Sequence, residues 1–96
     1  MEINNRDQAK EYIKSQIENY LKQKGIDTRK PFKCLNPTHA DKNPSMSYDG
    51  KRNKAHCFSC GADYDTLDLI GLDYNLSDSK EQFKKAYEIY HIIIKG

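Results

Sequence analysis

Two pairs of potential metal ligands, separated by 17 residues, constrain this 96-residue chain more than any other feature. Cys34 and His39 form the first pair, and Cys57 and Cys60 form the second. Structural zinc takes four N or S donors at about 2.0 to 2.3 Å. A Cys-x-x-Cys turn is tight enough to bring two sulfurs to one ion, and Gly61 follows it where positive φ is often needed. The spacing therefore predicts one closed structural Zn²⁺ site held by all four residues.

Other uses of the three cysteines explain less of the pattern. They cannot all pair within one molecule, and the chain shows no apolar signal segment, so we expect a reducing cytoplasm where disulfides are rare. A redox dithiol at Cys57 and Cys60 would leave Cys34 and His39 without a role, and buried bystander cysteines are the other alternative. His56 is the competing histidine. It directly precedes Cys57, and neighbours in an extended segment point to opposite faces, so His39 fits better.

The composition indicates a domain with a small core. Hydrophobic residues make up 36 % of the chain, tryptophan is absent, and the mean hydropathy is −0.96. A chain this short and polar buries little apolar surface, and structural zinc can offset that deficit by about 10 to 16 kcal/mol in small fingers. We therefore expect residues 1–96 to form a single zinc-binding domain whose middle unfolds without metal. Ile92-Ile93-Ile94 is too short to span a membrane, so no membrane partner is expected.

Positive charge is concentrated in the middle of the chain. Residues 22–54 carry nine basic side chains against three acidic ones, whereas residues 55–96 carry four basic and seven acidic ones. A charge run is ordinarily a solvated face. Here the asymmetry falls on the segment that folds around the metal, which favours a polyanionic partner.

Local patterns predict a small α+β fold, in which helices flank a zinc ribbon made of a short antiparallel sheet with two zinc knuckles. Apolar residues at i, i+3 and i+4 predict a helix over 6–24 with Gly25 as its stop, so residues 1–25 form the N-terminal helix. Residues 31–61 are predicted to form the zinc ribbon. Residues 65–94 are predicted to form the C-terminal helices.

Within the ribbon, strands are expected over 31–34, 45–48 and 51–57. Asp49-Gly50 is a favoured hairpin dipeptide, and a two-residue loop there would place Tyr48 opposite Lys51. That register gives one polar, basic face that should meet solvent or a ligand, and one partly apolar face. The first face consists of Ser45, Ser47, Arg52, Lys54 and His56, and the second of Met46, Tyr48, Lys51, Asn53 and Ala55.

Two helices are expected after Gly61. Asp65 can cap a helix over 66–70 that Gly71 ends or bends, which makes Leu72, Tyr74 and Leu76 loop residues. The segment 79–82, Ser-Lys-Glu-Gln, fits a capping box for the last helix. The predicted buried stripe of that helix consists of Phe83, Ala86, Tyr87, Tyr90 and Ile94.

From about Phe32 to Ile70 the sequence resembles the CHC2 zinc-binding domain of bacterial and phage DNA primases, the N-terminal domain of a DnaG-like primase. The resemblance is carried by Cys34-x4-His39, Lys42-Asn-Pro-Ser-Met46, His56-Cys-Phe-Ser-Cys-Gly-Ala62 and Leu67-Asp-Leu-Ile70. It departs in three places: the first turn is longer than in many members, Met46 replaces a phenylalanine, and Tyr64 stands where glycine is common. Such divergence suggests a phage or other mobile-element primase.

The resemblance implies a module that binds single-stranded DNA template and helps select the primer initiation site during DNA replication. Polymerisation would belong to a separate TOPRIM-type domain, acting in cis or in trans, and a replicative helicase is a further expected partner. We therefore expect no catalysis from this chain alone, although it would be part of a DNA primase, a nucleotidyltransferase. Our candidate DNA-contacting residues are Lys33, Lys42, Tyr48, Lys51, Arg52, Lys54 and Phe58.

An alternative function is a zinc-ribbon adaptor that docks on a polymerase or helicase, with its basic residues simply solvated. A zinc enzyme is disfavoured because four protein ligands leave no open position for water. The abrupt finish at Lys95-Gly96 suggests that the chain continues into further domains.

Overall fold

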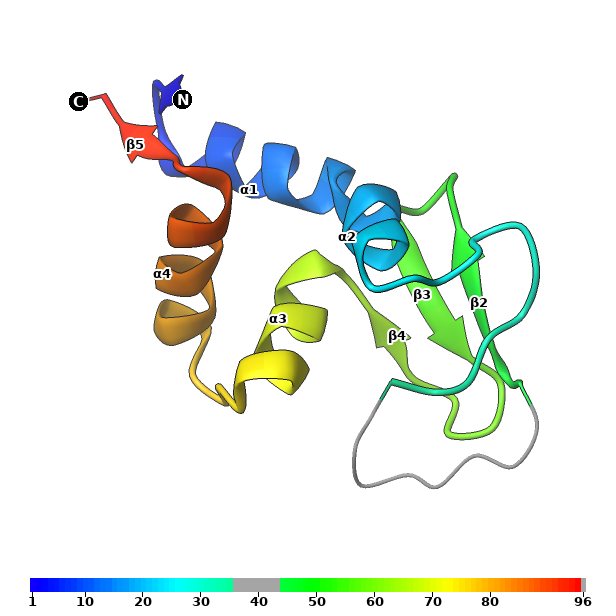
Figure 1. Ribbon diagram of the computed structural model, residues 1–96. Helices are drawn as coiled ribbons and strands as arrows, with labels where there is room; N and C mark the ends of the chain where they lie inside the picture. The colour runs from blue at the N-terminus through cyan, green and yellow to red at the C-terminus, as the bar shows by residue number, and fades with distance from the viewer. Residues whose placement is uncertain (36–43, 96) are drawn as a thin grey trace.

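The computed structural model describes residues 1–35 and 44–95, which form a small α+β fold with two sheets and four helices (Figure 1). This confirms the predicted fold class. The described elements are β1 (Glu2–Ile3), α1 (Arg6–Ser15), α2 (Ile17–Gln23), β2 (Met46–Asp49), β3 (Lys54–Cys57), β4 (Asp63–Tyr64), α3 (Thr66–Tyr74), α4 (Ser79–Tyr90) and β5 (Ile93–Ile94). The ribbon sheet β2-β3-β4 lies at one end of the molecule, and the β1-β5 sheet lies with both chain ends at the other.

The N-terminal helical segment is two helices rather than the single helix expected over 6–24. The Asn5 side chain caps α1 by accepting from the Gln8 N–H at 2.9 Å. At Gln16 the helical hydrogen bonding tightens, because the Gln16 N–H bonds the Ile13 carbonyl three residues back. Helix α2 starts just after it and runs in a new direction (Figure 1). The predicted stop at Gly25 is confirmed: its φ is +82°, and α2 ends before it at Gln23.

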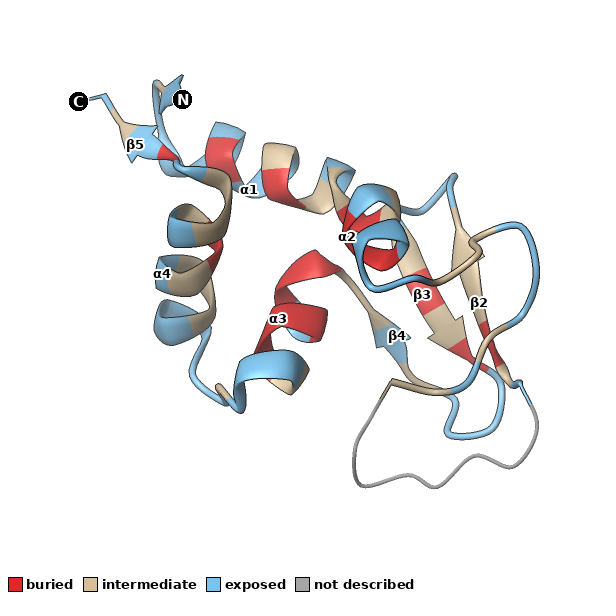
Figure 2. Ribbon diagram, viewed as in Figure 1, coloured by how far each residue is buried: buried red, intermediate tan, exposed pale blue. Residues whose placement is uncertain are grey.

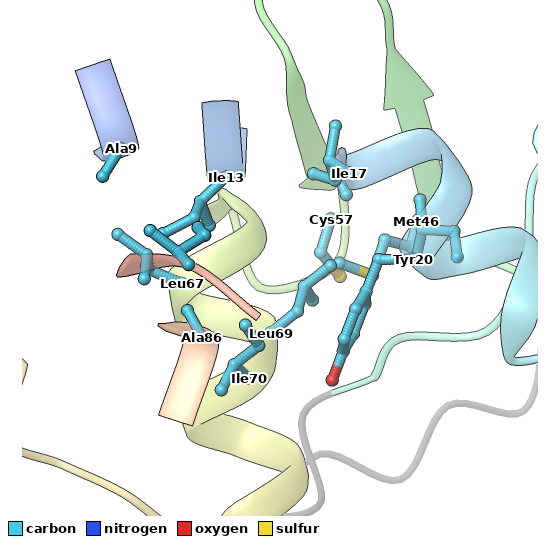
Figure 3. Close-up of a cluster of buried hydrophobic side chains, with 13 residues drawn as sticks. Ala9, Ile13, Ile17, Tyr20, Met46, Cys57, Leu67, Leu69, Ile70 and Ala86 are labelled. Carbon is cyan, nitrogen blue, oxygen red and sulfur yellow. The ribbon is translucent and has the colours of Figure 1, made fainter. Parts of the chain in front are cut away.

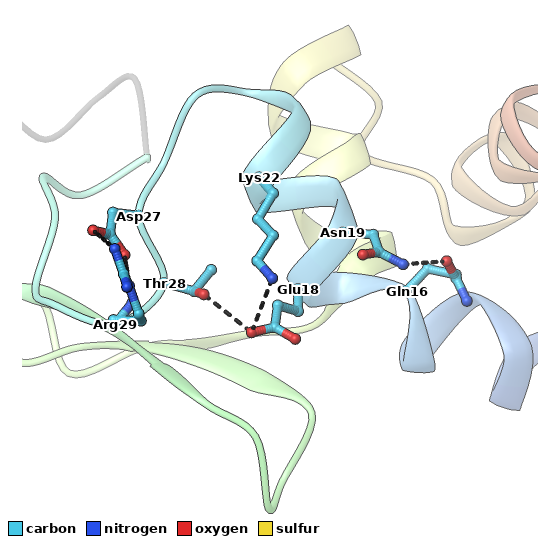
Figure 4. Close-up of polar contacts among 7 residues, drawn as sticks. All are labelled: Gln16, Glu18, Asn19, Lys22, Asp27, Thr28 and Arg29. Carbon is cyan, nitrogen blue, oxygen red and sulfur yellow. Dashed lines mark hydrogen bonds and ion pairs between the residues drawn. The ribbon is translucent and has the colours of Figure 1, made fainter.

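The loop that follows α2 folds back onto that helix (Figure 4). The Thr28 hydroxyl donates to Glu18 at 3.1 Å, and Lys22 pairs with the same carboxylate at 3.7 Å. Arg29 pairs with Asp27 at 3.1 Å, and its hydrogen bonds lower the pKa of Asp27 to about 2. These contacts direct the chain from the helix towards Phe32, where the ribbon begins.

The β2–β3 hairpin has a longer loop than expected. Asp49 pairs with Lys54, so residues 50–53 form the turn and the predicted two-residue loop at Asp49-Gly50 is wrong. The Asp49 carboxylate closes the turn by accepting the N–H groups of Lys51 at 3.1 Å and Arg52 at 3.4 Å. Asn53 takes the left-handed conformation, with φ 51°, which asparagine tolerates better than most residues. Lys51 and Arg52 therefore lie in the turn and not on a strand.

The observed pairing nevertheless keeps the predicted division of faces. Tyr48 pairs with Ala55 and Ser47 with His56, a register displaced by four residues from the expected one. An even displacement leaves each side chain on its original side of the sheet. One face carries Met46, Tyr48, Ala55 and Cys57, and the other carries Ser47, Asp49, Lys54 and His56.

Two further strands differ from expectation. The strand expected over 31–34 is a single bridge, in which Phe32 and Met46 exchange two backbone hydrogen bonds of 2.8 Å. The unpredicted strand β4 pairs antiparallel with β3, with His56 opposite Asp63. Nothing local marks residues 63–64 as a strand, because their order comes from the partner strand.

One cluster of buried side chains runs through the molecule (Figure 2). The ribbon face with Met46, Ala55 and Cys57 belongs to the same cluster as Ile17 and Tyr20 of α2 (Figure 3). The cluster continues into α1, α3 and α4. Its other members are Ala9, Ile13, Leu21, Leu67, Leu69, Ile70, Ala86 and Ile92. The helices therefore support the ribbon from one side and leave its opposite face open.

Helix α3 starts as predicted but runs further. Asp65 caps it in a reciprocal box with Asp68. The helix then continues through Gly71 to Tyr74, so Leu72 and Tyr74 are helical and not loop residues. Gly71 does not end the helix. It is a buried helical residue that Gln82 and the Leu76 carbonyl approach closely, so a side chain there would not fit.

The last helix begins differently from the prediction. Asp78, not Ser79, caps α4 by accepting from the Lys80 N–H at 3.0 Å. Gln82, expected to complete a capping box, instead donates to the Leu76 carbonyl at 2.9 Å. Of the predicted stripe, Ala86 is fully buried, whereas Phe83, Tyr87 and Tyr90 are half-buried against the core.

The two ends of the described chain pair with each other. Strand β1 runs parallel to β5, with Ile3 opposite Ile94, and the Met1 amino group donates to the His91 carbonyl at 2.8 Å. Ile94 therefore belongs to a strand and not to the helix stripe. None of the helices in the described ranges is long and apolar enough to cross a membrane.

Gly71→Ala should lower the free energy of unfolding by about 1 to 3 kcal/mol, although alanine normally favours helix. The new Cβ would lie 2.5 Å from Gln82 Nε2 and 2.7 Å from the Leu76 carbonyl oxygen. Urea unfolding followed by circular dichroism measures the change. The double variant G71A/Q82A should recover only part of the loss, because the backbone carbonyl remains. A gain in stability for G71A alone would contradict the close packing.

Tyr20→Phe should lower the free energy of unfolding by about 1 to 3 kcal/mol at neutral pH. The Tyr20 hydroxyl donates to Asp73, which Lys24 also holds at 2.8 Å. Burial, and then the Asp73 hydrogen bond, raise the pKa of Tyr20 well above its usual value. The stabilisation is therefore present below about pH 10 and lost above it, because only the unfolded tyrosine ionises there. Urea unfolding should show the difference between wild type and Y20F shrinking at high pH.

Tyr74→Phe is the control for this measurement, since Tyr74 is exposed on α3. It should leave stability near the wild-type value at each pH. A Y20F effect that stays constant through the alkaline range would contradict the role of the Tyr20 hydroxyl.

Candidate metal centre and nucleic-acid interface

Three thiols converge at one edge of the ribbon. The sulfur atoms of Cys34, Cys57 and Cys60 all lie within 4.8 Å of one another, and those of Cys34 and Cys60 are 4.0 Å apart. Tetrahedral zinc with Zn–S bonds of about 2.3 Å would hold its sulfur ligands about 3.8 Å apart. The cluster is therefore close to the size that zinc requires.

Local backbone geometry produces this convergence. Cys57 ends β3, and its carbonyl accepts the Gly61 N–H at 2.8 Å, which closes a tight turn around Cys60. Gly61 has φ +70°, as expected for the residue after such a turn. The Phe32–Met46 bridge then holds Cys34, two residues on, against the start of β2.

The polar surroundings favour the thiolate form of Cys57, the buried member of the cluster. Burial opposes ionisation, but hydrogen bonds from Ser45, from the Cys60 backbone and from the thiols of Cys60 and Cys34 outweigh it and lower the pKa of Cys57 to about 6. The Ser45 hydroxyl lies 3.5 Å from that sulfur. The Tyr64 hydroxyl lies 3.8 Å from the Cys60 sulfur. Since zinc binds the thiolate, the site is suited to a metal at neutral pH.

The fourth predicted ligand, His39, lies outside the described residues, as does Lys42. His56, the competing histidine, has a different partner: its Nδ1 lies 2.7 Å from the Asp63 carboxylate across the β3–β4 pair. Among residues 1–35 and 44–95, the potential metal-binding group beside the ribbon contains only the three cysteines.

A shallow hollow of about 680 Å³ lies on the hairpin, and Phe58, from the Cys57–Cys60 turn, is one of its lining residues. Four of the predicted DNA-contacting residues line it: Tyr48, Lys51, Arg52 and Phe58. Ser47, Asp49, Gly50 and His56 complete the lining. We refer to these eight residues as the hairpin hollow. It combines cations with aromatic rings, although Lys51 and Arg52 reach it from the turn rather than from the strand expected at 51–57.

Phe58 is the most exposed large hydrophobic side chain in the described structure, at 74 %. It lies inside the Cys57–Cys60 turn, and its ring meets His56 edge-to-face with centroids 4.7 Å apart. Tyr48 is half-buried against the core, and burial raises its pKa. Phe58 therefore offers more free ring surface than Tyr48.

Asp63 holds two residues of the hairpin hollow, although no sequence motif points to it. Its two carboxylate oxygens pair with Arg52 at 2.8 Å and with His56 at 2.7 Å. Hydrogen bonds from Arg52 and then His56 lower the pKa of Asp63. No local signal identified this residue, because its role depends on the β3–β4 pairing.

The remaining predicted contact residues in the described ranges are Lys33 and Lys54. Lys33 is exposed, and it lies between the bridge residue Phe32 and the first predicted ligand, Cys34. Lys54 is half-buried on β3, on the same open face as His56. Neither lines the hairpin hollow.

Comparison with known proteins places these features in a family. The CHC2 zinc finger profile matches residues 2–95. The DNA primase of Campylobacter jejuni is 41 % identical over 58 residues, which cover 60 % of this chain and 9 % of that protein. The DNA primase of Mycoplasma pneumoniae is 37 % identical over 91 residues, which cover 90 % of this chain and 14 % of that protein. The chain thus spans a small fraction of these relatives.

No solved structure matches the chain significantly. The profile nevertheless covers nearly the whole sequence, including both halves of the metal-binding pattern. The three thiols that the pattern provides meet at one point of the ribbon. The chain therefore belongs to the CHC2 zinc finger family and binds zinc.

Proposed function

We propose that this domain is the zinc-ribbon module of a DNA primase, and that it binds single-stranded DNA template and helps select the primer initiation site. The relatives named as DNA primases support the class of protein. The observation that carries the binding role is the hairpin hollow, where Lys51, Arg52 and Phe58 line one concave surface. Cations with exposed rings are what proteins use to bind single strands without reading each base.

The zinc has a structural role in this proposal. Cys34, Cys57 and Cys60 are three ligands and His39 is the fourth. Four protein ligands leave no position for water, so zinc supplies rigidity and no chemistry of its own. It would hold the Cys57–Cys60 turn, which carries Phe58, against the segment that carries Cys34.

The side chains of the hollow would contribute to DNA binding in different ways. Lys51 and Arg52 neutralise phosphates and release counterions. Asp63 holds Arg52 by one oxygen and leaves it half exposed, at 51 %, so other guanidinium donors can reach a phosphate. Phe58 offers a ring on which a base can stack. Lys33, Lys42 and Lys54 add positive charge along the path of the strand, and Tyr48 provides a second, less exposed ring.

The complete primase would supply the chemistry. The chain spans 9 % and 14 % of the two primase relatives named above. As the family resemblance implies, we assign polymerisation to a TOPRIM-type domain in cis or in trans. A replicative helicase is a further proposed partner, and the cytoplasm is the proposed compartment.

Replacing His39 with Asn should weaken zinc binding strongly, whereas the matched change His56→Asn should not. His39 is the proposed fourth ligand, and His56 is committed to Asp63. Zinc competition with a chromophoric chelator measures the affinity, and circular dichroism of the stripped protein measures the accompanying loss of fold. Equal zinc affinity for H39N and wild type would contradict the assignment. A loss in H56N alone would make His56 the ligand.

Single-stranded DNA binding should depend steeply on salt. If four or five phosphates are contacted, log K should fall against log salt with a slope of about −3, at about 0.7 per phosphate. Fluorescence anisotropy with a short labelled oligonucleotide measures it. K51Q/R52Q should weaken binding and flatten the slope. F58A should cost about 1 to 3 kcal/mol of binding while keeping the slope, because it removes stacking and no charge.

The control is K10Q/K14Q, which removes the same charge from α1, away from the hairpin. It should leave the oligonucleotide affinity nearly unchanged. Binding that is indifferent to salt, or equally weakened by both double variants, would instead support an adaptor that docks on a polymerase or helicase.

A further inference from the structure

A second hollow lies along α4, at the other end of the molecule from the ribbon. Its volume is about 570 Å³, in the range of small-ligand sites. Five lining residues share one face of α4, and one comes from the start of α1. They are Arg6, Ser79, Lys80, Phe83, Lys84 and Tyr87, and we refer to them as the α4 groove.

The α4 groove holds three cations and no carboxylate among its lining residues. In the described part of the chain, the side chains of Arg6, Lys80 and Lys84 take part in none of the observed ion pairs. Lys85, the neighbour of Lys84, does take part in an ion pair, with Glu88 at 3.4 Å. Positive charge has thus been gathered in a concave surface without an internal partner, which suits an anionic ligand.

The acidic side chains at positions 7, 78 and 81 lie close to the groove in sequence but do not line it. Asp78 uses its carboxylate to cap the Lys80 N–H. Asp7 and Glu81 are exposed on the first turns of α1 and α4 and do not line the groove. The positive charge of the groove therefore comes from side chains. It does not come from the N-terminus of α4, where Asp78 already accepts a hydrogen bond from the Lys80 N–H.

Two aromatic rings form the apolar part of the groove. Phe83 and Tyr87 pack half-buried against the core and meet at an interplanar angle of 65° with centroids 6.2 Å apart. Lys80 and Lys84 are one helical turn apart, with Phe83 between them in sequence. A ligand that reached both lysines would lie over this ring surface.

We propose that the α4 groove binds a nucleotide. Its phosphates pair with Lys80, Lys84 and Arg6, the Ser79 hydroxyl donates a further hydrogen bond, and its base lies against Phe83 and Tyr87. Phosphate is the anion with enough acceptor oxygens for three cations and a hydroxyl, and a base is the planar group that rings accept. The nucleotide is either free or one unit of a single strand. The inference does not rest on the proposed function, because the ribbon and the hairpin hollow share no residue with the groove.

Titration of the zinc-loaded full chain tests the proposal, with chemical shifts of the backbone amides as the readout. The probes are ATP, inorganic tripolyphosphate and a short oligothymidylate. ATP or the oligonucleotide should perturb amides of residues 79–87 and 6–7. Shifts from ATP identify a free nucleotide as the ligand, and shifts from the oligonucleotide alone identify a strand. Shifts confined to the hairpin, or no saturable shifts with any probe, would overturn the proposal.

Two variants separate specific from general effects. K80Q/K84Q should weaken binding of the responding probe by about tenfold, whereas K10Q/K14Q, with the same spacing and charge change on α1, should not. F83L keeps an apolar side chain in the core but removes the ring, so it should reduce any preference for ATP over tripolyphosphate. Thermal unfolding checks that each variant is folded. Equal effects of the two lysine pairs would show only general charge attraction and would overturn the site.

The outcome is separable from that of the proposed function. K51Q/R52Q should leave the α4 groove shifts intact, and K80Q/K84Q should leave the hairpin shifts intact. A failure at the groove with normal hairpin binding would reject this inference alone.

Discussion

The meeting of three sulfur atoms is the constraint on which the ribbon depends. Cys57 and Cys60 approach each other through a tight turn that their own segment encodes, but Cys34 is more than twenty residues earlier and must be carried to them. The Phe32–Met46 bridge does this, because it fixes the segment before Cys34 against the strand that pairs with Cys57. A metal bound there links the first and last parts of the ribbon, in a domain whose apolar core is small.

The ribbon has two unlike faces, and that difference determines which residues are available for binding. Met46, Ala55 and Cys57 lie on the side covered by α2, where they join the core. Ser47, His56 and Lys54 lie on the open side. Because α2 protects only one side, the polar face stays accessible, and the charged turn at its end contributes Lys51 and Arg52 to the hairpin hollow. Asp63 then fixes Arg52 and His56 from the adjacent strand.

The helices connect the ribbon to a second region with different chemistry. α3 belongs to the central cluster, held between α1 and α4, and Gly71 lets the Leu76 and Gln82 region approach closely. The described structure is elongated, about 46 Å in its longest dimension, so the ribbon and the outer face of α4 are well separated. Charge gathered at both ends can therefore serve separate ligands, or separate parts of one long ligand.

The sequence by itself determined the features that short-range chemistry controls. These include the chelating turn at Cys57–Cys60, the positive φ of Gly61 and Gly25, the Asp65 cap and the division of ribbon faces, which survived a wrong loop length because the register error was even. Only the tertiary structure decided the features that depend on distant partners. Strand β4, the β1–β5 pair and the role of Asp63 all arise from pairings between remote segments. Local periodicity carries no information about such pairings, because their free energy appears only when both segments are already in place.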